Sequence, residues 1–452
     1  MVSTSRQLHF GVSAGGSGLH RAAWRRPDSD VHAFPGVEPL KRLAQIAEAG
    51  KFDTFFLADG VALDVGTLPY APPFGSLEPL VLLSAISQVT ERIGLIGTAS
   101  TTFSQPYTLA RQLSTLDHVS GGRAGWNIVT SSAGAENYGD EPLPDHLSRY
   151  RRAAEFAEVV TGLWNGWDPD AVSADRENGL FADPAKVHPL DHRGEFYQVK
   201  GPLNVPRSPQ GRPVLVQAGS SSDGQAVGAK VADAIFTAQS ESAPAREFYA
   251  AIKGQARAYG RNPDHLLILP GLVPVVGDTE TSAWELQEEL DALIDIEHGR
   301  RVLGAQLGGA DLSELDLDRP IPEELLPHPD LIEGRRSRYA IYRELAVERK
   351  WPLRRLISRE LSGNGHWHVV GSPEQVADAL IGRFDERGAD GFNVIPPFSP
   401  LSLELFVEHV IPILQRRGYF RTEYEGTTLR EHFDLPAIPA LSVPSGSVPV
   451  GA

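Results

Sequence analysis

The stretch Ile93–Ser131, IGLIGTASTTFSQPYTLARQLSTLDHVSGGRAGWNIVTS, decides the fold of this chain. It begins with the β-rich run Ile93–Ala99. Pro106 can open a helix, because its missing N–H is not needed in the first turn. The pair Gly121-Gly122 can end that helix, since glycine tolerates positive φ. Ala124–Val129 then has the composition of a buried strand, so the stretch predicts a right-handed parallel β–α–β crossover.

The same alternation of strand and helix continues along the whole chain, and it predicts a parallel α/β fold. Eight β-rich runs are found, and eight is the number of strands that closes a (β/α)8 TIM barrel. An open, doubly wound sheet is the alternative, but no strand is followed by G-x-G-x-x-G. The expected strands are Leu8–Ser13, Asp53–Ala58, Ile93–Ala99, Ala124–Val129, Pro213–Gln217, Ala234–Ala238, Leu266–Val276 and Phe392–Pro396.

Two long stretches interrupt this alternation, and we expect both to be insertions in one barrel domain that spans residues 1–436. The stretch Asn165–Arg212 predicts a hairpin-like excursion, and Gly299–Gly371 is charged, interrupted by proline and partly helical. The tail Ala437–Ala452 is rich in Pro, Ser and Gly, which predicts a flexible C-terminal segment.

Composition excludes several classes of protein. The chain has 452 residues, no cysteine and a formal net charge of −16. The acidic balance argues against nucleic acid and anionic membranes as partners. The lack of cysteine excludes thiolate chemistry and fits a reducing compartment. No apolar run has the length of a membrane span and the start MVSTSRQLHF lacks the pattern of a signal peptide, so we expect a cytoplasmic protein.

Polar residues follow several of the expected strands, where the active sites of such barrels lie. Asp59 follows the second strand in FFLADG, although an Asp before Gly is also typical of a simple turn. Ser220 and Ser221 follow the fifth strand and open a helix, which is a suitable anion site as well as an ordinary cap. His146 and Tyr150 are spaced i, i+4 and share one helix face, where they would either face a ligand or cap the helix.

Other histidines and one loop are open to competing interpretations. The histidines of Asp117-His118, Asp191-His192 and His366-Trp367-His368 do not assemble into a ligand set, so we expect no metal site. His20, Trp24 and Arg25 lie in the loop after the first strand. They would either form a roof over a substrate or belong to an exposed loop.

The sequence motif in the central stretch also resembles that of a known family. TLDHVSGGRAGWNIVTS resembles a signature of the bacterial-luciferase-like flavin monooxygenases, nearest to the branch with nitrilotriacetate monooxygenase and dibenzothiophene-sulfone monooxygenase. The resemblance runs from AWRRP at Ala23 to the GSPEQVAD helix start that ends at Asp378. It implies a TIM barrel in which a set of residues binds flavin. That set is Asp59, Thr98 or its alternative Thr101, the His-x-x-x-Tyr pair His146 and Tyr150, and, at the phosphate, Ser220 and Ser221.

The function implied by the resemblance is a two-component FMN-dependent monooxygenase. Reduced FMN would come from a separate NAD(P)H:flavin reductase, since the chain has no dinucleotide fingerprint. With O2 it would oxygenate a small organic substrate, often with cleavage of a C–N or C–S bond, and a homo-oligomer (dimer or tetramer) is expected. No residue stands out as an acid or base. A deazaflavin-dependent oxidoreductase, a non-enzymatic flavin-binding protein and a metal-dependent hydrolase remain alternatives.

Overall fold

The computed structural model describes residues 6–439, apart from residues 74, 76, 132, 140–142, 219–221 and 333–335. Within these residues eight parallel strands form a closed ring. The ring closes because β10 pairs with β11 as well as with β9, and because β13 pairs with both β11 and β1. The predicted TIM barrel is thereby confirmed, and the open sheet is excluded. In ring order the strands are β1 (His9–Ala14), β2 (Thr54–Leu57), β3 (Gly94–Ser100), β4 (Ala124–Val129), β9 (Val214–Ala218), β10 (Ala234–Thr237), β11 (Leu267–Val276) and β13 (Gly391–Val394).

A ninth strand joins the sheet outside the ring, and the sequence analysis does not identify it. β12 (Trp367–Gly371) runs parallel to the second half of β11, in register from Leu272↔Trp367 to Val276↔Gly371. It lies at the end of the range 299–371, which is expected to be an insertion. Four of its five residues are only half-buried, so the continuous apolar pattern that marks the barrel strands is weak here.

Helices cover the outside of the barrel. The central crossover is as predicted: α3 starts at Pro106, and Gly121 ends it in the left-handed region with φ 70°. Among the described residues, no helix is long and apolar enough to cross a membrane. The outer helices are α1 (Glu38–Ala49), α2 (Pro79–Ile86), α3 (Pro106–Ser120), α4 (His146–Trp164), α5 (Ser222–Val231), α6 (Ser242–Ala258), α7 (Glu280–Ala292), α11 (Pro373–Asp385), α12 (Leu401–Leu405) and, after the π-helical turn Phe406–Val410, α13 (Ile411–Arg416).

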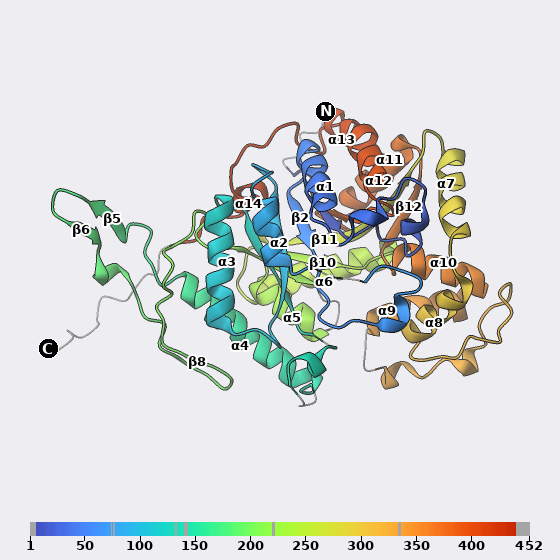
Figure 1. Cartoon of the computed structure of the whole chain (residues 1–452), viewed down its shortest axis with the longest axis horizontal. Coiled ribbons are helices and arrows are strands. Elements are labelled where there is room, and N and C mark those ends of the chain that lie inside the picture. Colours follow the sequence, from blue (N-terminus) through green and yellow to red (C-terminus); the bar gives the residue numbers. More distant parts are fainter. Residues whose placement is uncertain are drawn as a thin grey trace.

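The two interrupting stretches have different structures. Residues 165–212 contain two antiparallel hairpins, and the hairpin β5–β6 extends away from the barrel (Figure 1). Residues 294–361 enclose a hydrophobic cluster of their own, which includes Leu303, Tyr342 and Leu356. Of the C-terminal tail only residues 437–439 are described, so its predicted flexibility lies outside the described residues. The elements are β5 (Val172–Asp175), β6 (Leu180–Ala182), β7 (His192–Arg193), β8 (Gln198–Val199), α8 (Ile296–Gln306), α9 (Arg336–Arg343) and α10 (Leu353–Gly363).

A short C-terminal helix, α14 (Leu429–His432), fills the amino end of the barrel. Leu429 and Phe433 pack against Phe56 and Ile96 from the barrel strands. The close approach requires glycine at the start of β3, because a Cβ on Gly94 would lie 2.5 Å from Leu429 Cδ1. Side chains therefore fill the amino end of the barrel.

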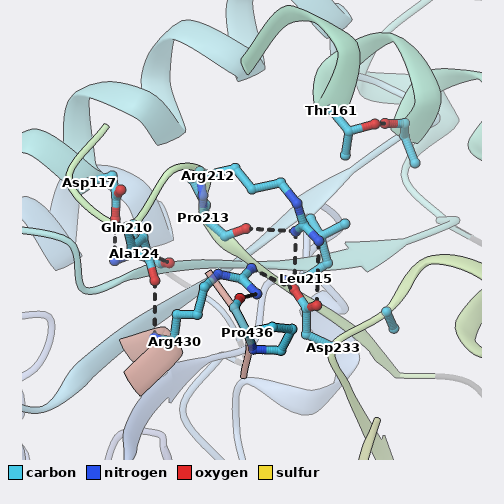
Figure 2. A network of polar contacts seen from close by, with 12 residues as sticks. Asp117, Ala124, Thr161, Gln210, Arg212, Pro213, Leu215, Asp233, Arg430 and Pro436 are labelled. Atoms are coloured by element: carbon cyan, nitrogen blue, oxygen red, sulfur yellow. Dashed lines mark hydrogen bonds and ion pairs between the residues drawn. The ribbon is translucent and has the colours of Figure 1, made fainter. Parts of the chain in front are cut away.

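A buried ion cluster holds the helix α14 in place. Figure 2 shows Arg212 and Arg430 converging on Asp233, which immediately precedes β10. The N···O distances are 3.1 Å from Arg212 and 3.2 Å from Arg430, and the Leu215 N–H donates to the same carboxylate at 2.9 Å. Burial by itself would raise the pKa of Asp233, but the two guanidinium groups outweigh it and lower that pKa below its ordinary value.

Removal of the Asp233 carboxylate should destabilise the whole domain. Asp233→Ala leaves two mostly buried guanidinium groups without their counter-ion, so we expect the free energy of unfolding to fall by about 3–5 kcal/mol. Urea unfolding followed by circular dichroism measures the loss. Asp278→Ala, at an exposed loop position, is the matched control and should stay within about 0.5 kcal/mol of the wild type. An equally small loss for Asp233→Ala would contradict the assigned role of the cluster.

The same cluster should give the stability a defined pH dependence. Because the folded pKa of Asp233 is depressed, its stabilisation is complete above the unfolded pKa of about 3.9 and is lost as the pH falls below it. The difference in unfolding free energy between wild type and Asp233→Asn should be constant from pH 7 to pH 5. It should narrow by roughly 1 kcal/mol by pH 3. A difference that widens on acidification would show that the carboxylate is not held in its charged form.

Candidate active site

A network of hydroxyl groups rigidifies the carboxyl ends of β3 and β4. The Oγ atoms of Ser100 and Ser131 lie 2.8 Å apart, and Ser100 Oγ also accepts from the Thr102 N–H at 3.1 Å. Thr102 Oγ1 in turn accepts from the Ser131 N–H at 3.2 Å. These bonds hold the two strand ends in one conformation, which is what a preorganised binding site needs.

Two polar side chains face each other on these neighbouring strands. Thr98 and Asn127 are paired in the β3–β4 register, and Asn127 Nδ2 donates to Thr98 Oγ1 at 2.8 Å. Their exposed fractions are only 4% and 3%. Within the described part of the chain, Asn127 Oδ1 is buried and has no hydrogen-bond partner. A buried acceptor without a partner is costly, and it fits a site that is completed by a ligand carrying an N–H group.

Thr101, the alternative to Thr98, has a different role. Its hydroxyl donates to the Val129 carbonyl at 3.1 Å, and its backbone N–H donates to the same carbonyl at 3.0 Å. The side chain therefore extends the β3–β4 pairing by one step. This is the strand-end threonine bonded to local backbone, so the geometry favours Thr98 over Thr101 as the ligand-facing residue.

Asp59 lies directly after β2, as the sequence indicates, and it is half-buried. Its carboxylate accepts from the N–H of Gly60 at 2.9 Å. Burial raises the pKa of Asp59 above its ordinary value, while the Gly60 bond lowers it and the nearby Glu78 raises it further. This carboxyl group is therefore easier to protonate than an exposed aspartate.

The first turn of α4 is anchored beside the same strand ends. Arg149 donates from Nη1 to the Ser131 carbonyl at 2.6 Å, so the turn that carries His146 and Tyr150 lies at the carboxyl end of the barrel. The cap of this helix is Asp145, whose carboxylate accepts from the Ser148 N–H at 3.0 Å. Capping thus does not require the His146–Tyr150 pair. Tyr150 is half-buried, and the side chain of His146 lies outside the described part of the structure.

Ser220 and Ser221 also lie outside the described residues, although both flanks of this segment are described. β9 ends at Ala218, and α5 begins at Ser222. β9 pairs with β4, and α5 contacts α4. The segment 219–221 therefore connects two elements that adjoin the Asn127 strand and the helix that begins at His146.

The side chains of the loop after β1 that were considered for substrate contact, His20, Trp24 and Arg25, form polar contacts with other parts of the protein. His20 is buried, with Nε2 3.3 Å from Asp291 Oδ1. Trp24 donates from Nε1 to the Tyr70 carbonyl at 2.7 Å, and Arg25 donates to the Leu293 carbonyl. These bonds tie the loop to the segment after β2 and to the end of α7, so a contact with substrate remains a prediction for this trio.

Sequence reasoning missed Asn127, although a signal for it was present. An asparagine within the apolar run Ala124–Val129 stands out, because β-strands of parallel barrels are buried on both faces. The sequence does not identify the hydrogen-bond partner of Asn127, because its pairing with Thr98 depends on the register of two strands. Among the described residues, no group of three or more His, Cys, Asp or Glu side chains could hold a metal ion.

Comparisons with known proteins identify the family. Residues 18–391 match the model of the luciferase-like monooxygenase family. The chain is 46% identical over 437 residues to N-acetyl-S-(2-succino)cysteine monooxygenase of Bacillus subtilis, covering 96% of this chain and 98% of the relative. It is 41% identical over 446 residues to nitrilotriacetate monooxygenase component A of Aminobacter aminovorans, with coverage of 96% and 98%.

A solved structure agrees with these relatives. Riboflavin lyase, determined with modified FMN and its substrate riboflavin, superposes with a TM-score of 0.82 at 32% identity and covers 95% of this chain and 96% of that one. The predicted resemblance, including its branch, is confirmed by these matches, and so is the prediction of an enzyme that acts as a monooxygenase. The chain belongs to the luciferase-like monooxygenase family.

Proposed function

We propose that this protein is the oxygenase component of a two-component, FMN-dependent monooxygenase. A separate NAD(P)H:flavin reductase supplies reduced FMN, and O2 is the second substrate. A small organic molecule is oxygenated, with cleavage of a C–N or C–S bond as the favoured outcome. The observation that carries the proposal is the buried Asn127–Thr98 pair near the carboxyl ends of β3 and β4, which leaves hydrogen-bonding capacity for a ligand among the described residues.

In this proposal the chain's own residues bind and orient the cofactor. Ser220 and Ser221 hold the phosphate at the start of α5, where the helix dipole favours an anion. His146 and Tyr150 approach from α4, and Asp59 and Thr98 line the ring. Reduced FMN, when bound, supplies the electrons that activate O2. The protein excludes water and places the substrate beside the ring.

Several further features belong to the same proposal. The loop after β1 covers the substrate side of the site with His20, Trp24 and Arg25. Hydrogen bonds to Asp291, Tyr70 and Leu293 hold these side chains in place. Residues 1–436 act as one catalytic domain with insertions at about 165–212 and 299–371, followed by a flexible tail at 437–452. The protein is a cytoplasmic homo-oligomer, which fits the absence of cysteine from the sequence.

Dependence on a reductase is the first test of this function. The purified protein should not oxidise NADH or NADPH by itself. Addition of any reductase that releases reduced FMN, together with a panel of small amines and thioethers, should give products heavier by one oxygen atom or their cleaved fragments. Mass spectrometry with 18O2 detects the incorporated oxygen.

The same assay separates the alternatives. A non-enzymatic flavin-binding protein would bind FMN without product formation on any substrate of the panel. A deazaflavin-dependent oxidoreductase would transfer hydride with a reduced deazaflavin and would incorporate no 18O. Either result would contradict the proposed monooxygenase.

A charge reversal should locate the phosphate. Ser221→Asp places a carboxylate beside the proposed phosphate site, and we expect the Kd for FMN to rise by about tenfold or more, because like charges are brought together in a partly desolvated site. Ser221→Asn is the matched control of similar size without the charge, and it should weaken FMN much less. Riboflavin, which has no phosphate, should bind wild type and Ser221→Asp alike. An unchanged FMN affinity in Ser221→Asp would place the phosphate elsewhere.

A further inference from the structure

A buried histidine, His298, lies where the region 294–361 meets the carboxyl end of the barrel. Helix α8 begins after Asp295, whose carboxylate accepts from the His298 N–H at 2.8 Å, so His298 belongs to the first turn of that helix. Its ring stacks on Tyr70, with the ring centroids 4.6 Å apart and the planes at 13°. Tyr70 lies in the segment between β2 and α2, and the loop that follows a strand is at the carboxyl end of a parallel barrel. The region 294–361 thus places a histidine on the side of the barrel where substrate is expected.

The hydrogen-bonding state of this ring is defined by Arg301. Nη2 of Arg301 lies 3.2 Å from His298 Nδ1, and a guanidinium group can only donate. Nδ1 therefore accepts, and the proton of the neutral ring is on Nε2. Within the described residues, Nε2 is buried without a hydrogen-bond partner, and the exposed fraction of His298 is 3%. A buried donor in this state is costly unless a ligand supplies the acceptor.

His20, a buried histidine of the loop after β1, has no such remaining capacity. Its Nδ1 accepts from the Ala22 N–H at 3.2 Å, and its Nε2 lies 3.3 Å from Asp291 Oδ1. Both ring nitrogens of His20 have partners within the protein, so the fold accounts for them. The donor on His298 is not accounted for in this way.

The charges around the His298 ring select the kind of acceptor. Burial lowers the pKa of His298, and the positive charges of Arg301 and Arg21 lower it further. The carboxylates of Asp295 and Asp64 act in the opposite direction, but by less. Both carboxylates also have partners, since Asp295 caps α8 and Asp64 lies 3.3 Å from Arg301 Nη1. With the positive end of the α8 dipole added, the ring is neutral at pH 7 and its surroundings favour an anionic acceptor.

We propose that His298 binds a carboxylate group of the organic substrate. The Nε2–H donates to a carboxylate oxygen, and the stack on Tyr70 fixes the plane from which it donates. Arg301 is a positioning residue, because it keeps the proton on Nε2. Its own bonds to the Gly66 carbonyl at 2.9 Å and to Thr67 Oγ1 at 3.3 Å hold it in place. The inference rests on the proposed function, and it names the substrate class as amines or thioethers that carry a carboxylate.

Two thioethers of nearly the same shape test this site. Thiodiacetate carries a carboxylate on each arm, and dipropyl sulfide carries a methyl group in the same place. Each is titrated by calorimetry into the full chain saturated with oxidised FMN, which has no electrons to activate O2, so the readout is binding and needs no turnover. The wild type should bind thiodiacetate saturably. His298→Phe keeps a ring against Tyr70 and removes the donor, so the Kd for thiodiacetate should rise by about tenfold or more and that for dipropyl sulfide by less than about threefold.

Matched variants distinguish recognition from general damage. His298→Gln, which restores an N–H donor, should recover part of the affinity for thiodiacetate. His265→Phe changes a histidine just before β11, at the amino end of the barrel, and should bind thiodiacetate as the wild type does. Arg301→Gln no longer holds the proton on Nε2 and should also weaken thiodiacetate. Thermal melts of each variant confirm folding, and Arg301→Gln carries the test if His298→Phe does not fold.

The outcomes separate this inference from the function beneath it. No binding of thiodiacetate by the wild type, or equal affinities in the wild type and His298→Phe, would overturn the carboxylate site, even if uncharged substrates are oxygenated normally with the reductase. Failure of the whole substrate panel in the reductase assay would overturn the proposed function, and the substrate role of His298 with it. The two failures are distinguishable because binding and oxygenation are measured separately.

Discussion

Closure of the parallel sheet between β10 and β11 is the constraint on which the rest of the structure depends. All eight ring strands run in the same direction, so closure gathers every carboxyl end at one mouth and every amino end at the other. Asp233 stands directly before β10, and its carboxylate forms ion pairs with Arg212, which precedes β9, and with Arg430 of α14. The ion cluster therefore joins the start of β10 to the segment before β9 and to the C-terminal helix α14, and it fixes the amino end of the barrel.

Gln210 at the amino end of the barrel and the Thr98–Asn127 pair at the carboxyl end differ in how much of their hydrogen-bonding capacity is used. At the amino end, Gln210 bonds to Asp117 and to the Ala124 carbonyl, and its own oxygen accepts from the Arg430 N–H. At the carboxyl end, Thr98 and Asn127 leave a donor and an acceptor unpaired among the described residues. Unpaired buried groups reduce stability, and the ion pairs of Asp233 with Arg212 and Arg430 at the opposite end help to offset that cost.

How much of this could be read from the sequence depends on the range of the interaction involved. The eight ring strands were predicted within one or two residues at most of their ends, because each is a short apolar run between turns. α3 was predicted with its bounding Pro106 and Gly121 because these residues act locally. β12 was missed because its residues are half-buried, and its partner β11 is about a hundred residues away in the chain. The fastening of α14 by Arg430 was also missed, since no local pattern reveals a partner such as Asp233.

The candidate site shows the same limit more sharply. Its positions follow the strands, so Asp59, Thr98 and the α4 turn could be expected at the mouth before the structure was known. The choice between Thr98 and Thr101 could not, because both are threonines near the end of one strand. The register decides it: Thr101 meets the Val129 carbonyl and donates its proton to it, whereas Thr98 meets the amide of Asn127 and keeps its proton. Two residues of the same type, three positions apart, thus differ in their hydrogen bonds, one to the backbone and one to a side chain, and only the pairing of β3 with β4 tells them apart.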